Sequence, residues 1–238
     1  MVRKIWNCCI SLLLVLAGSG LRAQTIPTET PSVQGIDIGV DLYGIGAHLL
    51  GSDFLSTEVS AELNLKNRFF PIVEAGYGRT DAWAEQGIHY KGSAPYMRLG
   101  MNYNFMYKKD NKVGNWFLGV RYGISAVSYD VNTPPVEDPI WGTTLPNPNL
   151  EDMIWGGTIP YDYSGQKATV RWYELLGGVR VQLTNSIRMG WTIRMKWRHG
   201  ASVSRYGDPW FVPGFGTYGS SATGITYTIS YYIPWPKK

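Results

Sequence analysis

The stretch Pro95–Tyr107 reads PYMRLGMNYNFMY, and its apolar side chains recur at every second position. One set comprises Pro95, Met97, Leu99, Met101, Tyr103, Phe105 and Tyr107, and the other comprises Tyr96, Arg98, Gly100, Asn102, Asn104 and Met106. Successive side chains of a β-strand point to opposite faces. We therefore predict a strand with one continuously apolar face and one polar or small face. Its length suits a strand that crosses a bilayer, which takes about 9–11 tilted residues.

Seven further stretches repeat this alternation. They are Ile36–Leu42, Leu55–Leu65, Val73–Gly78, Trp116–Ala126, Tyr173–Leu183, Ile187–Arg198 and Gly224–Ile233. A secreted β-sandwich also alternates, but its polar face is an open surface. Here the apolar faces are rich in Trp, Tyr and Met, whereas the polar faces are rich in Gly and sparse in Lys, which suits a narrow interior. The predicted fold class is therefore all-β, an eight-stranded antiparallel transmembrane β-barrel.

The connections between these stretches alternate in length. The long ones are Gly44–Ser52, Thr80–Ala94, Asp130–Gln166 and His199–Ala222, and the short ones are Lys66–Arg68, Lys108–Asn115 and Thr184–Ser186. Outer-membrane barrels have short periplasmic turns and longer outside loops. We therefore expect four long outer loops, both termini in the periplasm, and a location in the outer membrane of a Gram-negative bacterium.

The first residues are typical of an export signal. Arg3 and Lys4 precede the apolar run Ile10–Gly18, which is shorter than the roughly 20 residues of a membrane-spanning helix. We predict a signal peptide over residues 1–23 and one outer-membrane β-barrel domain over residues 24–238.

Cleavage there would change the chemistry available to the chain. Cys8 and Cys9 would leave with the signal, so we expect neither a disulfide nor a thiolate metal site. The whole chain has 22 basic and 18 acidic residues, a net charge of +4. Without Arg3, Lys4 and Arg22, 19 basic residues remain against 18 acidic ones, a net charge of +1. That balance gives no electrostatic support for a nucleic-acid partner.

Several motifs carry a resemblance to a known family. They are KGSAPYMRLGMNYN, WFLGVRYGIS, RWYELLGGVRVQL, VPGFGTYGSS and the ending TYTISYYIPWPKK. Together they resemble an uncharacterised family of outer-membrane β-barrels from Bacteroides-type bacteria, domain of unknown function 6048, over nearly the whole mature chain. The resemblance implies the barrel fold and the outer membrane, and it brings no catalytic residues. The final strand also resembles the signal read by the barrel-assembly machinery, which we expect as a partner during biogenesis.

The inner faces of the predicted strands carry both signs of charge. We expect a lumen charge network of Asp37, Asp41, Glu58, Glu62, Glu74, Arg98, Arg121, Glu174, Arg180, Arg188, Arg194 and Lys196, with Arg198 on the same face. The interior of an eight-stranded barrel is just wide enough for its own side chains. Since an unpaired buried charge is costly, these groups should pair across the lumen and fill it. A narrow ion or solute channel through rearranging pairs is the alternative.

The longest connection contains a repeated phrase, IWGTTLP followed by IWGGTIP, within residues 140–160. Folded as an antiparallel hairpin, it would place Trp141 opposite Ile159 and Leu145 opposite Trp155 on one face. That face could close the barrel mouth as a lid or meet a surface protein or glycan. The binding candidates are Trp141, Trp155, Tyr161, Tyr163, Trp210 and Phe211, with Phe215 adding to an aromatic outer surface.

Catalytic candidates are few. His48, His89 and His199 do not have metal-ligand spacing, and we expect no metal and no cofactor. His199 and Ser202 place a base near a hydroxyl at the outer end of a strand, as a lipid-modifying hydrolase or acyltransferase would require. A histidine near a serine is common by chance, so we predict a structural or surface-interaction protein, with that enzyme as an alternative. Outer-membrane lipid is its expected surrounding.

Overall fold

The computed structural model describes residues 32–83, 88–107, 114–132, 136–137, 144–145, 162–204 and 207–235 of the 238-residue chain. The predicted signal peptide over residues 1–23 lies outside these residues. No helix in the described part is both long and apolar enough to cross a bilayer.

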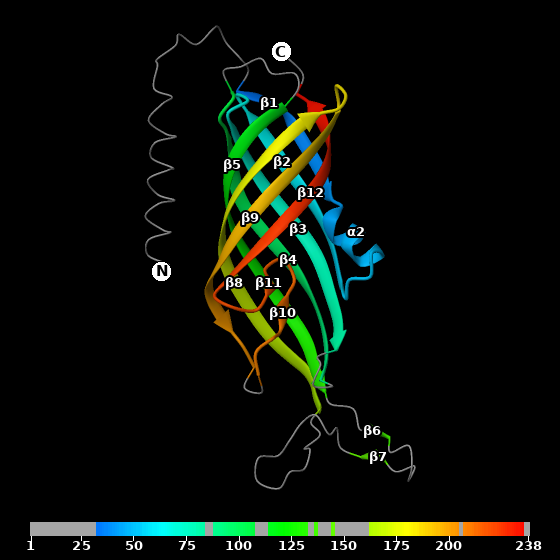
Figure 1. Ribbon diagram of the computed structural model, residues 1–238. Coiled ribbons are helices and arrows are strands. Elements are labelled where there is room, and N and C mark those ends of the chain that lie inside the picture. Colours follow the sequence, from blue (N-terminus) through cyan, green and yellow to red (C-terminus); the bar gives the residue numbers. More distant parts are fainter. Residues whose placement is uncertain are drawn as a thin grey trace, which may run out of the picture. The chain divides into compact units, whose positions relative to one another are not determined.

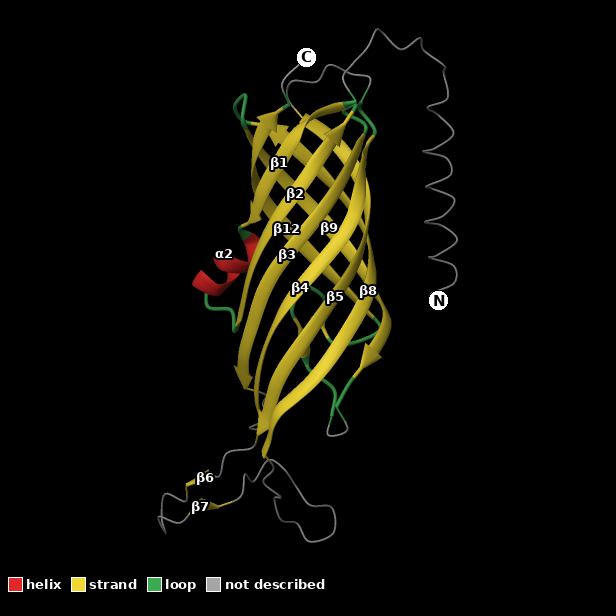
Figure 2. Cartoon of the chain, turned by 180° about the vertical axis from the view of Figure 1, so that it is seen from behind, coloured by secondary structure: helices red, strands yellow, loops and turns green. Residues whose placement is uncertain are grey.

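Eight antiparallel strands form a closed barrel (Figures 1 and 2). They are β1 (Val33–Asp41), β2 (Phe54–Leu65), β3 (Phe69–Trp83), β4 (His89–Asn104), β5 (Gly114–Asn132), β8 (Asp162–Gln182), β9 (Ile187–Ser202) and β12 (Ser221–Pro234). Each strand pairs with its neighbours along the chain, and β1 pairs with β12 to close the barrel. Closure leaves no barrel strand as a free edge along its full length. The predicted fold class is confirmed.

Successive side chains along each strand point to opposite sides of the barrel wall. In β4, Met97 and Leu99 are 46% and 49% exposed, whereas Arg98 between them is 2% exposed. The same inversion holds in β9, where Ile193 is exposed and Arg194 is buried. Apolar residues therefore cover the outside and charged residues the inside, the reverse of a water-soluble barrel.

The strands differ in length, and this corrects one expected loop. β3 and β4 stay paired up to Trp83 opposite His89, so most of the expected loop Thr80–Ala94 is strand. β5 and β8 likewise pair up to Asn132 opposite Asp162. These four strands extend together past the end of β1, at the end of the barrel opposite the short turns (Figure 1). Outward positions in that region hold polar residues such as Asp81, Lys91 and Ser93, so the apolar alternation that marked the other strands is missing and the sequence suggested a loop.

The connection between β1 and β2 contains a helix, α2 (Tyr43–Leu49), that the sequence pattern did not predict. The Asp41 carboxylate accepts hydrogen bonds from the backbone N–H of Tyr43 (3.1 Å) and of Tyr227 (3.0 Å). It therefore satisfies one of the donors that the start of the helix leaves without an intrahelical partner. The helix lies outside the barrel wall (Figure 2), and Leu50 at its end is 91% exposed.

Two short hairpins lie in the other connections. β6 (Val136–Glu137) pairs with β7 (Thr144–Leu145), so the backbone partner of Leu145 is Val136. Its expected partner Trp155 lies outside the described residues. Between β9 and β12, β10 (Phe211–Val212) pairs with β11 (Gly216–Thr217).

Candidate functional site

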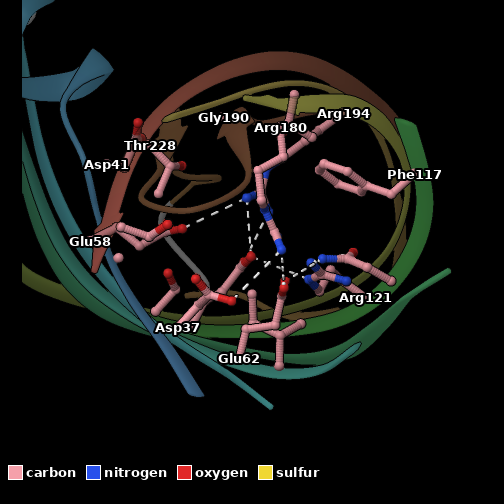
Figure 3. A pocket seen from close by; sticks show the side chains of 17 residues that line it. Asp37, Asp41, Glu58, Glu62, Phe117, Arg121, Arg180, Gly190, Arg194 and Thr228 are labelled. Carbon is pink, nitrogen blue, oxygen red and sulfur yellow. Dashed lines mark hydrogen bonds and ion pairs between the residues drawn. The ribbon is translucent and has the colours of Figure 1, made fainter. Parts of the chain in front are cut away.

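The lumen contains two layers of ion pairs, and Figure 3 shows those of their residues that line a pocket. Ten of the twelve expected charged side chains take part in it: Asp37, Glu58, Glu62, Glu74, Arg98, Arg121, Glu174, Arg180, Arg188 and Arg194. They come from seven of the eight barrel strands, and strand parity turns each of them inward. The network thus joins nearly the whole wall across its centre.

Glu74 is the hub of the central layer. One carboxylate oxygen lies 2.7 Å from Arg98 Nε and 2.9 Å from Arg194 Nη1, and the other lies 3.2 Å from Arg121 Nε. Glu174 meets Arg98 at 3.2 Å and Arg194 at 3.1 Å, and Glu58 pairs with Arg98. Every charge in this layer therefore has an opposite charge within hydrogen-bond reach, as burial requires.

A second layer lies nearer the short turns. Arg180 Nη1 lies 2.6 Å from Glu62 Oε1, and Arg188 Nη1 lies 2.7 Å from Asp37 Oδ2. Asn102 joins the layers, because its amide donates to Glu62 (2.7 Å) and its carbonyl accepts from Arg121 (2.8 Å). Asn102 thus connects Glu62 of the second layer to Arg121 of the central layer, and Arg180 lies 3.9 Å from Asp37 within the second layer.

The remaining two expected members have other roles. Asp41 accepts hydrogen bonds from the backbone N–H groups of Tyr43 and Tyr227, as described above. Lys196 Nζ donates to the backbone carbonyls of Gly214 (2.8 Å) and Phe215 (3.1 Å), so it holds a loop instead of pairing with an acid. Arg198 lies with its guanidinium 4.3 Å from the centre of the Tyr218 ring.

A cavity remains beside the network. Its volume is about 50 Å³, and it is lined by small residues such as Gly39 and Ser60 together with Asp37 and Arg180. One water needs at least about 10–15 Å³ of such space, so the cavity has room for only a few waters. The Oδ1 atom of Asp37 is buried here without a hydrogen-bond partner among the protein atoms, which suits a bound water.

We call the end of the barrel opposite the short turns the barrel mouth. The loop that carries β10 and β11 closes it, on the side of the ion pairs away from the short turns (Figure 1). Phe215 and Val212 are fully buried, and Phe215 packs 5.7 Å from Trp172, centre to centre. This burial corrects the expectation that Phe215 adds to an outer aromatic surface. Gly214 has a φ of +82° beside the Tyr96 ring, where a side chain would clash. We call residues 207–220 the mouth loop.

Two residues that the sequence analysis did not single out join the mouth loop to the ion pairs. The Tyr96 hydroxyl donates to Glu58 Oε2 (2.8 Å), and the Trp172 indole N–H donates to Glu174 Oε1 (2.6 Å). Both share strand parity with charged residues, Arg98 in β4 and Glu174 in β8, and that shared parity was the available signal. Aromatic residues at inward positions in an otherwise charged row indicate where the polar network ends.

The expected binding aromatics separate into three groups. Trp141, Trp155 and Tyr161 lie outside the described residues. Phe211 packs against Phe54, with ring centres 4.5 Å apart. Tyr163 and Trp210, far apart in sequence, line one open cleft of about 560 Å³ at the mouth, together with Val131, Gly207, Asp208, Pro209, Thr217 and Tyr218.

The two catalytic candidates lie at the end of β9 that is opposite the short turns. A bulge there leaves His199 without a partner in β8, and its ring centre lies 5.0 Å from that of outward-facing Tyr173. Ser202 pairs with Thr169 in the ladder, and both candidates are exposed. No hydrogen bond joins the side chains of these two described residues. In the described part of the chain, no group of three or more His, Cys, Asp or Glu side chains could hold a metal ion.

Comparison with known proteins identifies a family that the chain matches. The model of a family described as Domain of unknown function (DUF6048) matches residues 1–238. No curated protein matches the chain.

Solved structures are similar at low sequence identity. Neisserial surface protein A is 13% identical, with a TM-score of 0.42, over 84% of this chain and 94% of that chain. Ail, the attachment invasion locus protein of Yersinia pestis, solved with the heparin analogue sucrose octasulfate, is 7% identical, with a TM-score of 0.39, over 85% and 99%. A major outer membrane protein from Thermus thermophilus is 12% identical, with a TM-score of 0.45, over 85% and 100%.

Proposed function

The chain belongs to the DUF6048 family, and we propose that it is an integral outer-membrane barrel with a closed lumen that acts through its outer surface. The observation that carries this proposal is the inverted barrel, with charges paired inside and apolar side chains exposed outside. In water such a surface would be a large exposed apolar patch, which soluble monomers rarely have. In a bilayer the same surface is buried against lipid.

The outer wall also supports a membrane boundary. Exposed apolar residues follow one another along the strands up to Tyr77 in β3 and Pro95 in β4. Beyond them Trp83 is exposed at the end of β3, but most other outward positions of the four long strands are polar and include Arg79, Asp81, Lys91, Ser93, Ser128, Asp130, Lys167 and Arg171. Charged side chains avoid the hydrocarbon layer, so this change of polarity suits the outer headgroup region. The strand ends and the mouth loop then face the exterior.

The closed lumen favours a structural or surface-interaction protein over a channel. An ion that crosses would have to break pairs such as Glu74 with Arg194 and then pass the buried mouth loop. Disrupting one partner of a buried pair costs about 3–5 kcal/mol. The cavity between these barriers has room for a few waters only.

We propose a Gram-negative, Bacteroides-type host, both termini in the periplasm, and insertion by the barrel-assembly machinery. The short turns between β2 and β3 and between β8 and β9 support this orientation, because periplasmic turns are the short ones in outer-membrane barrels.

Single-cysteine labelling on whole cells tests location and orientation together, because both native cysteines lie within the first nine residues. A membrane-impermeant maleimide should label Ser128→Cys on intact cells. It should label Asn185→Cys, in the turn after β8, only once the outer membrane is permeabilised. Ile193→Cys, which is 61% exposed on the apolar wall, should resist labelling in both states.

The unsubstituted chain is the control for the two native cysteines. Labelling of Asn185→Cys but not of Ser128→Cys on intact cells would mean that the orientation is inverted. Labelling of Ile193→Cys as fast as of Ser128→Cys would contradict a lipid-covered wall.

A further inference from the structure

The cleft at the barrel mouth brings three amphipathic aromatic rings together. Tyr163 comes from the outer end of β8, and Trp210 and Tyr218 come from the mouth loop. Asp208 and Thr217 add a carboxylate and a hydroxyl to the same lining. The volume of about 560 Å³ lies within the range of about 300–1,000 Å³ found for small-molecule sites.

A bulge in β8 brings Tyr163 to this lining. Tyr129 pairs with Gln166, but Val131, two residues further along β5, pairs with Tyr163, so β8 has one extra residue there. Gly165 in the bulge has a φ of +67°, which glycine adopts without strain. The extra residue reverses the parity of β8, and Tyr163 shares the inward face with Val131. Bulges commonly re-aim side chains in this way next to functional sites.

The other two rings are supported from behind. Trp210 stacks on Tyr90, with centres 5.2 Å apart and planes 13° apart, and the Tyr90 hydroxyl donates to the Phe211 carbonyl (3.1 Å). The Tyr218 ring is covered on one face by the Arg198 guanidinium. The backbone N–H of Tyr218 donates to the Trp210 carbonyl (2.9 Å), which fixes the two residues together. The rings are therefore held in place before any ligand arrives, which lowers the entropic cost of binding.

We propose that this cleft binds an uncharged saccharide. This inference rests on the proposed function, in which the barrel mouth faces the exterior. The C–H faces of a pyranose ring stack on the amphipathic rings of tyrosine and tryptophan. The Asp208 carboxylate accepts hydrogen bonds from vicinal hydroxyl groups, and such charge-assisted bonds are the stronger ones. The same carboxylate disfavours an anionic ligand.

Peptide and lipid fit the lining less well. An extended peptide binds by adding to a free strand edge, but Val131 and Tyr163 are paired with each other, as are the backbones of Trp210 and Tyr218. A lipid chain offers nothing to Asp208 or Thr217, and the cleft lies on the inner side of the wall, away from the apolar belt.

Saturation-transfer NMR on the refolded full chain in nanodiscs tests the proposal with cellobiose, maltose and N,N′-diacetylchitobiose as ligands. We expect at least one of them to receive saturation at its ring protons and to bind measurably. Tyr163→Ala and Trp210→Ala should each weaken that binding by roughly five- to ten-fold, the loss expected for one aromatic contact. Asp208→Asn keeps the shape of the side chain and should weaken it by a similar factor.

Trp83→Ala is the matched control, because Trp83 is an exposed tryptophan at the outer end of β3 and does not line the cleft. It should leave the affinity unchanged. Since Trp210 also packs on Tyr90, its replacement could loosen the loop; Tyr163→Ala and Asp208→Asn then decide the result. Binding unaffected by both variants would overturn the site, and so would no binding of any of the three disaccharides. Cysteine labelling on whole cells with the expected pattern would then show that the proposed location stands while the saccharide site fails.

Discussion

Near the short turns and the barrel centre, ten charged side chains borne by strands neutralise one another, whereas at the mouth a loop fills the barrel with Val212, Pro213 and Phe215. The first region is closed by electrostatic pairing between groups whose positions are set by strand parity. The second is closed by apolar packing of a segment that could in principle leave. The ion pairs therefore fix the barrel, while the mouth loop shapes the surface at the barrel mouth. Four substitutions, from the largest expected effect to the smallest, test this division.

Glu74→Ala should be the most damaging change. It removes the hub of three arginines and leaves buried positive charge without its partner. The free energy of unfolding should fall by about 3–5 kcal/mol, measured by urea unfolding of the protein refolded in detergent micelles. A loss under about 1 kcal/mol, the worth of an exposed pair, would contradict a tightly coupled network.

Phe215→Ala should cost about 3 kcal/mol, at the low end for a buried phenylalanine because the loop can collapse into the space. Limited proteolysis should now cleave within residues 207–220, while the barrel strands stay protected. Phe105→Ala is the matched control, because Phe105 is 53% exposed and its loss should leave the loop uncut. An uncut loop in Phe215→Ala would mean that the loop is held by something other than this packing.

Lys196→Met should cost about 1.5–3 kcal/mol, because a charged donor to two loop carbonyls is lost. The same change in the Phe215→Ala background should cost less, since the loop is already loosened. A double-mutant cycle by urea unfolding compares the cost of Lys196→Met in the two backgrounds. The difference is the energetic coupling between Lys196 and Phe215. Strict additivity would show that they act separately.

Asp81→Ala should have the smallest effect. Asp81 lies 2.6 Å from His89 Nε2 and 3.5 Å from Lys91 Nζ, but this group is largely exposed at the ends of β3 and β4 opposite the short turns. Solvent screening leaves such pairs worth at most about 1 kcal/mol, so the urea midpoint should hardly move. A decrease in the free energy of unfolding as large as that for Glu74→Ala would contradict the expectation that buried ion pairs contribute more to stability than exposed ones.

Much of the barrel could be predicted from the sequence because period-two alternation is a local signal. Arg98 between Met97 and Leu99 is enough to assign the two faces of β4, and no knowledge of its neighbours is needed. The pairing of each charge was not predictable in this way. Glu74 meets Arg194, 120 positions away, and that contact depends on strand register and barrel closure.

The irregular segments had no comparable signal. Helix α2 is only seven residues long, and two of its residues are glycines. The inward turn of the mouth loop depends on Gly214 and on carbonyls that accept from Lys196, neither of which produces a periodic pattern. The bulge at Gly165 reverses parity, so counting from the centre of β8 assigns Tyr163 to the wrong face. Side chains near such irregularities make up the cleft, which is why the sequence indicated Tyr163 and Trp210 without placing them together.

The most direct test of the central claim is conductance across a planar bilayer, with insertion verified in parallel on an Ile193→Cys version of each protein, whose cysteine should be protected from a water-soluble maleimide. We predict that the unsubstituted protein carries no steady current, and that Phe215→Ala also carries none, because the ion pairs still close the lumen when the mouth loop is loosened. A steady ohmic current from the inserted, unsubstituted protein would contradict the account. A steady current from Phe215→Ala but not from the unsubstituted protein would show that the mouth loop, and not the ion pairs, closes the lumen.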